Sequence, residues 1–142
     1  MGISRPGGPE VLEIVDLPVP QPGPGEVRIR VSAATVNPTD VGLRELGAGL
    51  PTPWVPGMEL AGLVDEVGDG VRLALGTPVM AVVSPRRPQG GAQAELVVVP
   101  EESAVPVPAG LSDVEAATVP MNGLTARLAL DRLHCPPARR SG

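Results

Sequence analysis

The clearest pattern in this chain is a strict alternation of apolar and polar side chains over residues 26–36. Because successive side chains of a strand point to opposite faces, a period of two predicts a strand with one buried face. The face expected to be buried consists of Val27, Ile29, Val31 and Ala33, and the opposite face of Arg28, Arg30 and Ser32.

Shorter apolar runs bounded by glycine and proline predict further strands. They cover residues 11–15, 57–67, 77–83 and 92–99. A Gly-Asp-Gly turn signal at residues 68–70 follows the second of these runs. Short strands separated by turn residues about every ten positions are typical of a small barrel or sandwich. The pattern therefore predicts a mainly β fold.

Helical signals are confined to two places. One helical turn is expected at residues 41–46. After residue 110, Ser112 and Glu115 have the spacing of a capping box, in which each side chain satisfies a free backbone donor at a helix start. We expect Pro120 to end that helix and Asn122 to cap a second one over residues 124–133. The second helix would carry an apolar face of Leu124 and Leu128, with Ala129 at its edge, and such a face needs a partner.

Composition narrows the classes of function. The chain of 142 residues has a net charge of −5, and its 11 basic residues are all arginines scattered along the sequence, so nucleic-acid binding is not expected. Apolar runs fall short of the ~20 residues of a membrane span. The single Cys135 cannot form an internal disulfide, and a cytoplasmic location is the expectation. The only aromatic residue is Trp54, so the core must be aliphatic.

Candidate chemistry lies where the predicted strand ends. Asn37 precedes a proline, which stops the strand and presents polar side chains at its end. Asn37 can contact a ligand through its amide or can bond to its own turn. Asp40 can take part in proton transfer or can cap the following turn. Glu59 is expected to accept backbone hydrogen bonds and so to hold a loop.

Five motifs carry a family resemblance: VNPTD, PGMELAG, GDGVRLALGTPVMAV, GGAQAELVVVP and TVPMNGLTA. In this order they resemble the N-terminal, GroES-like domain of the medium-chain dehydrogenase/reductase superfamily, and most closely its zinc-independent quinone oxidoreductase branch. The resemblance implies a partly open barrel with short C-terminal helices. It divides the chain into a GroES-like domain at residues 7–121, a connection at 122–133 and an atypical tail at 134–142.

The same resemblance implies a chemistry. In that branch NADPH passes a hydride to a quinone or enone, and the family is often dimeric. Carried over, Asn37 and Asp40 would be catalytic, and Asn37 and Thr125 would contact the cofactor. No metal is expected, because Met58 stands where zinc-dependent relatives have histidine and no cysteine lies nearby.

The sequence also departs from the family. It contains no Gly-x-Gly-x-x-Gly phosphate loop, so the nucleotide-binding Rossmann domain is expected to be absent and the chain alone to be inactive. Two other classes therefore stay open. The chain can be a non-catalytic fragment with an exposed apolar helix, or a binding module that retains the barrel without cofactor chemistry.

Overall fold

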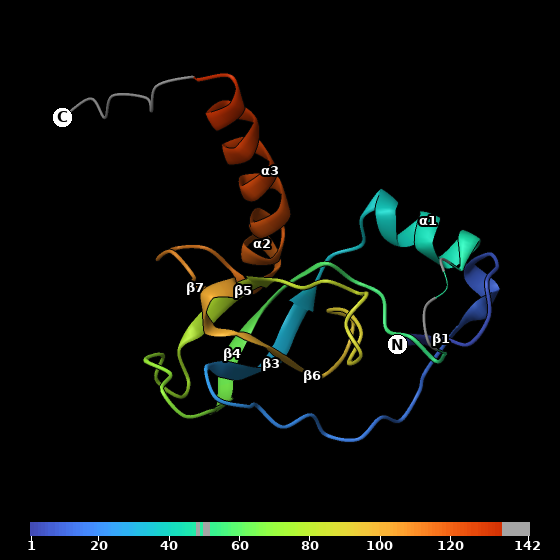
Figure 1. Cartoon of the computed structure of the whole chain (residues 1–142), viewed down its shortest axis with the longest axis horizontal. Coiled ribbons are helices and arrows are strands. Elements are labelled where there is room, and N and C mark those ends of the chain that lie inside the picture. The colour runs from blue at the N-terminus through green and yellow to red at the C-terminus, as the bar shows by residue number, and fades with distance from the viewer. Residues whose placement is uncertain (48, 50–51, 135–142) are drawn as a thin grey trace.

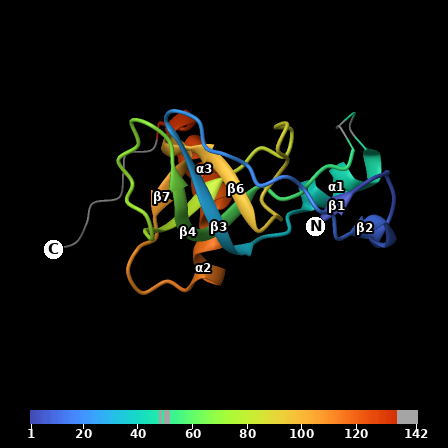
Figure 2. The ribbon, with the colours of Figure 1, turned by 90° about the horizontal axis from the view of Figure 1, so that it is seen from below.

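The computed structural model describes residues 1–47, 49 and 52–134. Five strands form one antiparallel sheet in the order β6-β3-β4-β5-β7. They are β3 (Glu26–Ala34), β4 (Glu59–Val67), β5 (Pro78–Val82), β6 (Leu96–Pro100) and β7 (Ala104–Pro106). The two edge strands are consecutive in the chain and are joined through the 3-10 helix Glu101–Ser103, so the sheet curls into a half-barrel (Figure 1, Figure 2). The predicted mainly β, partly open barrel is confirmed.

The alternating stretch becomes β3. Val27 and Ile29 are fully buried and line the main core inside the barrel. The register with β4 shifts just before Ala33, which packs with a second cluster on the opposite face. At this bulge a Cβ on Gly62 would overlap the carbonyl oxygen of Arg30, so glycine is needed there. The single buried face predicted for this strand is therefore interrupted at the bulge.

The other strands follow the prediction to different degrees. The runs at 57–67 and 77–83 are confirmed as β4 and β5. The run at 92–99 starts its strand four residues late, because the backbone N–H of Ala92 bonds to Gly57, outside the sheet, at 3.0 Å. Strand β7 was not predicted, since a strand of three residues that ends in a proline is too short to show alternation.

A small second sheet lies beside the barrel. Strand β1 (Gly2–Ile3) pairs with β2 (Leu12–Glu13), and Trp54 exchanges two backbone hydrogen bonds with β1. The predicted strand over residues 11–15 was too long, because the proline-started 3-10 helix Pro9–Val11 occupies its beginning. Trp54 is buried in the cluster that joins this sheet to the rest of the chain.

Three α-helices complete the described part of the chain: α1 (Pro38–Leu46), α2 (Asp113–Ala117) and α3 (Val119–Arg132). Helix α1 is longer than the turn predicted at 41–46, because it begins directly at Pro38. The capping box of α2 is confirmed, with the backbone N–H of Ser112 donating to Glu115 Oε2 at 2.9 Å. Helix α2 packs on β3 and β4 (Figure 2).

The expected helix break was misplaced. Pro120 does not end α2, and Asn122 does not cap the next helix. The break falls at Thr118, and Pro120 lies in the first turn of α3, where a missing N–H costs no intrahelical bond. Asn122 instead donates its side-chain amide back to the carbonyl oxygen of Thr118 at 2.7 Å.

Helix α3 leaves the barrel and projects away from it (Figure 1). None of its residues is buried in the described structure, and Leu124 and Leu128 are about half exposed. The predicted apolar face therefore has no covering partner among residues 1–47, 49 and 52–134. No helix in this described part of the chain has the length and apolar character needed to cross a membrane.

Candidate functional site

The candidate site begins in the short connection between the end of β3 and the start of α1. Asn37 is the N-cap residue of α1, and Pro38 occupies the first helical position, which suits its fixed φ. The backbone N–H of Asn37 donates to Asp40 Oδ2 at 2.8 Å, and the N–H of Asp40 donates to the carbonyl of Asn37 at 2.9 Å. These two predicted site residues are therefore bonded to each other.

Asp40 has a structural task. Its side chain is 4% exposed, and its second oxygen, Oδ1, accepts the backbone N–H of Gly57 at 2.8 Å. One carboxylate thus joins the first turn of α1 to the loop before β4. The capping role that the sequence suggested for Asp40 is present, and its role in proton transfer stays a prediction.

The amide of Asn37 is oriented by its neighbours. Its Nδ2 donates to Thr35 Oγ1 at 3.1 Å and to Glu59 Oε1 at 3.2 Å. Thr35 Oγ1 in turn donates to the same Glu59 oxygen at 2.9 Å. Because a carboxylate oxygen only accepts, the nitrogen of Asn37 must face Glu59 and its oxygen must face away.

Glu59 lies at the centre of this arrangement. It is 1% exposed, and its other oxygen, Oε2, accepts the backbone N–H of Met121 at 2.8 Å. The expectation that Glu59 accepts backbone hydrogen bonds is confirmed for Met121. Sequence reasoning missed Thr35 and Met121 as its partners, because the distance of 62 residues between Glu59 and Met121 leaves no local signal.

Thr125, the predicted cofactor contact, lies on α3 four residues after Met121. That spacing places it on the same helix face, about 6 Å further along the axis. Its side chain is exposed. Hydrogen bonds through Glu59 therefore connect Asn37 to Met121, one helical turn before Thr125. The contact of Thr125 with a cofactor stays a prediction.

The rim of the site holds Thr39 and Met58. The Thr39 hydroxyl donates to Met58 Sδ at 3.0 Å. A thioether and an amide are not the ligand set of a catalytic zinc site, which uses histidine, cysteine or carboxylate. Among residues 1–47, 49 and 52–134, no three histidine, cysteine or acidic side chains gather closely enough to hold a metal ion. Cys135 lies outside the described residues.

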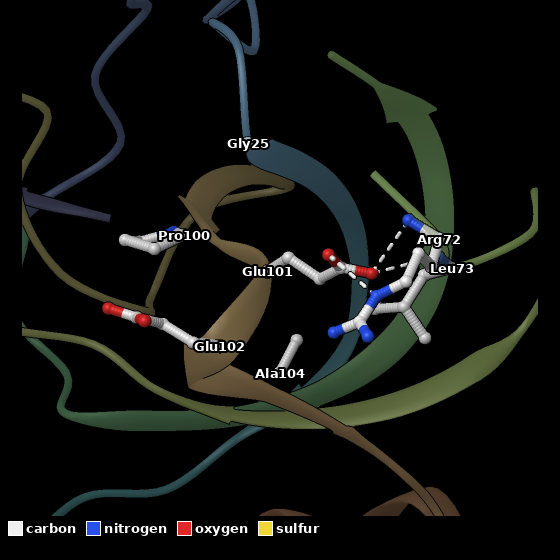
Figure 3. A pocket seen from close by; sticks show the side chains of 7 residues that line it. All are labelled: Gly25, Arg72, Leu73, Pro100, Glu101, Glu102 and Ala104. Atoms are coloured by element: carbon white, nitrogen blue, oxygen red, sulfur yellow. Dashed lines mark hydrogen bonds and ion pairs between the residues drawn. The ribbon is translucent and has the colours of Figure 1, made fainter. Parts of the chain in front are cut away.

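A pocket opens at the other end of the barrel (Figure 3). Glu101 Oε1 accepts the backbone N–H groups of Arg72 at 2.8 Å and Leu73 at 3.0 Å. The Glu102 side chain points away from this pair of bonds (Figure 3). The residues that line this pocket in the described chain include none of the predicted site residues. We interpret Glu101 in this pocket as a residue that stabilises the turn at Arg72 and Leu73.

The fold and the ordered motifs are those of one family. Residues 23–109 match the alcohol dehydrogenase GroES-like domain, and the chain belongs to that family. The resemblance to the N-terminal domain of the medium-chain dehydrogenase/reductase superfamily is thereby confirmed. The expected domain boundary after residue 121 falls inside α3 and stays a prediction.

Three similar proteins place the chain among its relatives. A chloroplastic quinone-oxidoreductase homolog of Spinacia oleracea is 38% identical over 129 residues, which cover 87% of this chain and 39% of that protein. A crystal structure of an NAD-dependent alcohol dehydrogenase superposes with a TM-score of 0.84 at 38% identity, covering 96% of this chain and 48% of the other. A mycobacterial protein solved in complex with NADPH has a TM-score of 0.78 at 33% identity, covering 99% and 42%. The chain thus spans about two fifths of the curated relative and less than half of the solved chains.

Proposed function

We propose that this chain is the substrate-side domain of a zinc-independent, NADPH-dependent oxidoreductase that reduces quinones or enones. The observation that carries the proposal is the bonded path from Asn37 through Glu59 to Met121. It connects the polar end of the barrel to the helix that follows, which is the side on which a cofactor-binding part would join. Similarity to quinone oxidoreductases and to a protein solved with NADPH supports the choice of reaction and cofactor.

The chain's own groups would act by position. Bound NADPH supplies the hydride, and the protein supplies orientation and polar contacts. Both hydrogens of the Asn37 side-chain amide are engaged within the chain. Asn37 would therefore meet a ligand through its amide oxygen, which faces the backbone N–H of Asp40 in the capping box of α1 and has a second lone pair for a ligand. The exposed hydroxyl of Thr125 is free to turn toward a cofactor amide or ribose hydroxyl.

A proton must also reach the reduced acceptor. Asp40 already accepts two backbone N–H groups. Within the described part of the chain, the exposed Thr39 hydroxyl is bonded only to a thioether, which is a weak acceptor. Thr39 is therefore the side chain that can most readily exchange its bond and relay a proton from water to the acceptor oxygen.

A chimera tests the proposal directly. The chain replaces the matching N-terminal part of the mycobacterial relative, and NADPH oxidation is followed with a panel of quinones and enones. We expect oxidation that depends on the acceptor, no turnover by the chain alone, and a loss of about tenfold or more in Asn37→Ala. A folded chimera that binds NADPH but reduces none of the acceptors overturns the proposal.

A binding module without cofactor chemistry is the second candidate. It is favoured by the main core, which residues of this chain form by themselves. Val27 and Leu60 in this core are fully buried, as in a barrel that folds on its own. A cooperatively melting monomer that binds an enone in the absence of NADPH would support it. In that case the chimera would give no turnover.

A further inference from the structure

We infer that Glu59 is a positioning residue that holds the Asn37 amide and the first turn of α3 in one hydrogen-bonded unit. Its two carboxylate oxygens accept hydrogen bonds from different segments. Oε1 receives Thr35 and Asn37, and Oε2 receives the backbone N–H of Met121. Neither end of this path can rotate without losing a bond to the same buried carboxylate.

The start of α3 shows why this link is needed. A helix begins with four backbone N–H groups that lack intrahelical partners, and a side chain at the N-cap normally satisfies one of them. Thr118 is the N-cap residue of α3, but its hydroxyl donates backward to the carbonyl of Glu115 at 2.8 Å. Within the described chain Thr118 makes no side-chain cap bond to α3. Glu59 takes over that role from strand β4.

The charge of the cap adds to the effect. A carboxylate at a helix N-terminus is favoured by the helix dipole and by charge-assisted hydrogen bonds. Glu59 is 1% exposed, so the bond to Met121 is shielded from water. The same anion fixes which way the Asn37 amide faces, because only donors can approach it.

The consequence is a coupling between the two sides of the proposed site. Any shift of α3, for example when a cofactor-binding part moves against it, pulls on the carboxylate that orients Asn37. This consequence rests on the proposed function, whereas the bonded unit itself does not. Residues on the acceptor side and on the cofactor side would then be set by one glutamate.

The test uses NMR on the 142-residue chain. In Glu59→Gln, the side chain has one acceptor oxygen and one NH₂ donor, so it cannot accept at both ends. We expect the Met121 backbone N–H to exchange with solvent about tenfold faster, and the Asn37 side-chain NH₂ signals to shift in the same variant. The matched control is Glu101→Gln, which removes a comparable carboxylate at the other barrel end and should leave both signals in place.

A second variant guards against loss of folding. Thr35→Val keeps the shape of the side chain and removes the hydroxyl that is bonded to both Asn37 and Glu59. We expect the Asn37 NH₂ signals to shift and the Met121 exchange to rise several-fold. If either signal changes alone, or if Glu101→Gln changes both as strongly, the inference is overturned. Because the readout involves neither NADPH nor a quinone, an inactive chimera would sink the proposed function and leave this inference standing.

Discussion

The two ends of the barrel are each held by a glutamate, but the two residues differ in what they join. Glu59 is 1% exposed and receives donors from the segment after β3 and from α3. The Glu101 side chain is 19% exposed and receives neighbouring backbone N–H groups of one turn, at Arg72 and Leu73. Glu59 therefore ties two separate segments to its own strand, whereas Glu101 ties its own segment to a single turn at Arg72 and Leu73.

This difference teaches where function can be placed. Glu101 joins its own segment to one turn only, because both of its side-chain donors belong to adjacent residues (Figure 3). The Glu59 end cannot rearrange in parts, since its donors come from two separate segments, one of them 62 residues away from Glu59 in the chain. Polar groups that must keep a fixed geometry, such as the Asn37 amide, are better supported by the arrangement around Glu59.

Replacing each glutamate by leucine should separate the two ends most strongly. In Glu59→Leu the half-buried donors of Thr35, Asn37 and Met121 lose their acceptor, which costs about 3–5 kcal/mol of unfolding free energy. In Glu101→Leu the freed N–H groups are near solvent, and the loss should be about 1 kcal/mol. Chemical denaturation of both variants measures the difference. Equal losses would contradict the comparison.

Each end also has a glycine where two backbones meet. A Cβ at Gly91 would overlap the carbonyl oxygen of Gly57 beside the Glu59 end, and one at Gly68 would overlap that of Gly23 near the Glu101 end. We expect Gly91→Ala and Gly68→Ala each to cost about 2–3 kcal/mol, because backbone must shift. Gly42→Ala is the matched control, since its Cβ would meet open space. Thermal melting ranks the three variants, and the comparison fails if Gly68→Ala also shifts the Asn37 side-chain signals.

The regular part of the fold could be read from the sequence. The period of two predicted β3, because a buried face leaves its mark on every second residue. The apolar runs at 57–67 and 77–83 predicted β4 and β5, in which several consecutive residues are buried. Signals that depend on turn chemistry were less complete. Pro120 is ambiguous in sequence, since a proline can follow one helix or lie in the first turn of the next. In the structure it lies in the first turn of α3, because the helix break falls at Thr118.

The candidate site could be predicted only in part. Asn37 and Asp40 were visible because a strand running into Asn-Pro ends abruptly. The engagement of the Asn37 amide was not visible, because it depends on Thr35 and Glu59 meeting across two strands. The bond from Met121 to Glu59 is a contact set by the whole fold, for which local sequence patterns carry no information.

Removing a local cap at the Glu59 end should have a smaller effect. Ser112 caps α2 in a box with Glu115, and the backbone bond from Ser112 is the main reason that the pKa of Glu115 lies below its usual range. Ser112→Ala should cost about 1 kcal/mol, since it removes one cap bond. Because α3 takes its cap from Glu59, Met121 exchange should stay as in the wild type. Denaturation together with amide exchange checks both statements, and a faster Met121 exchange would show that α3 depends on the α2 cap instead.

The smallest effect is expected from the pH dependence of the strand pair between the two ends. Asp65 on β4 accepts the Nε–H of Arg28 on β3 at 2.7 Å, and this bond, assisted by Arg30, holds the pKa of Asp65 below its usual range. A carboxyl whose pKa is lower in the folded state stabilises the fold above its unfolded pKa, near 3.9, and loses that contribution as pH falls through the folded value. Melting temperatures between about pH 6 and pH 2 should therefore fall less steeply in Asp65→Asn than in the wild type. If the variant and the wild type lose stability in parallel over that range, the Arg28–Asp65 pair contributes nothing measurable to stability. The two ends of the barrel are then held together by Glu59 and the hydrophobic core alone.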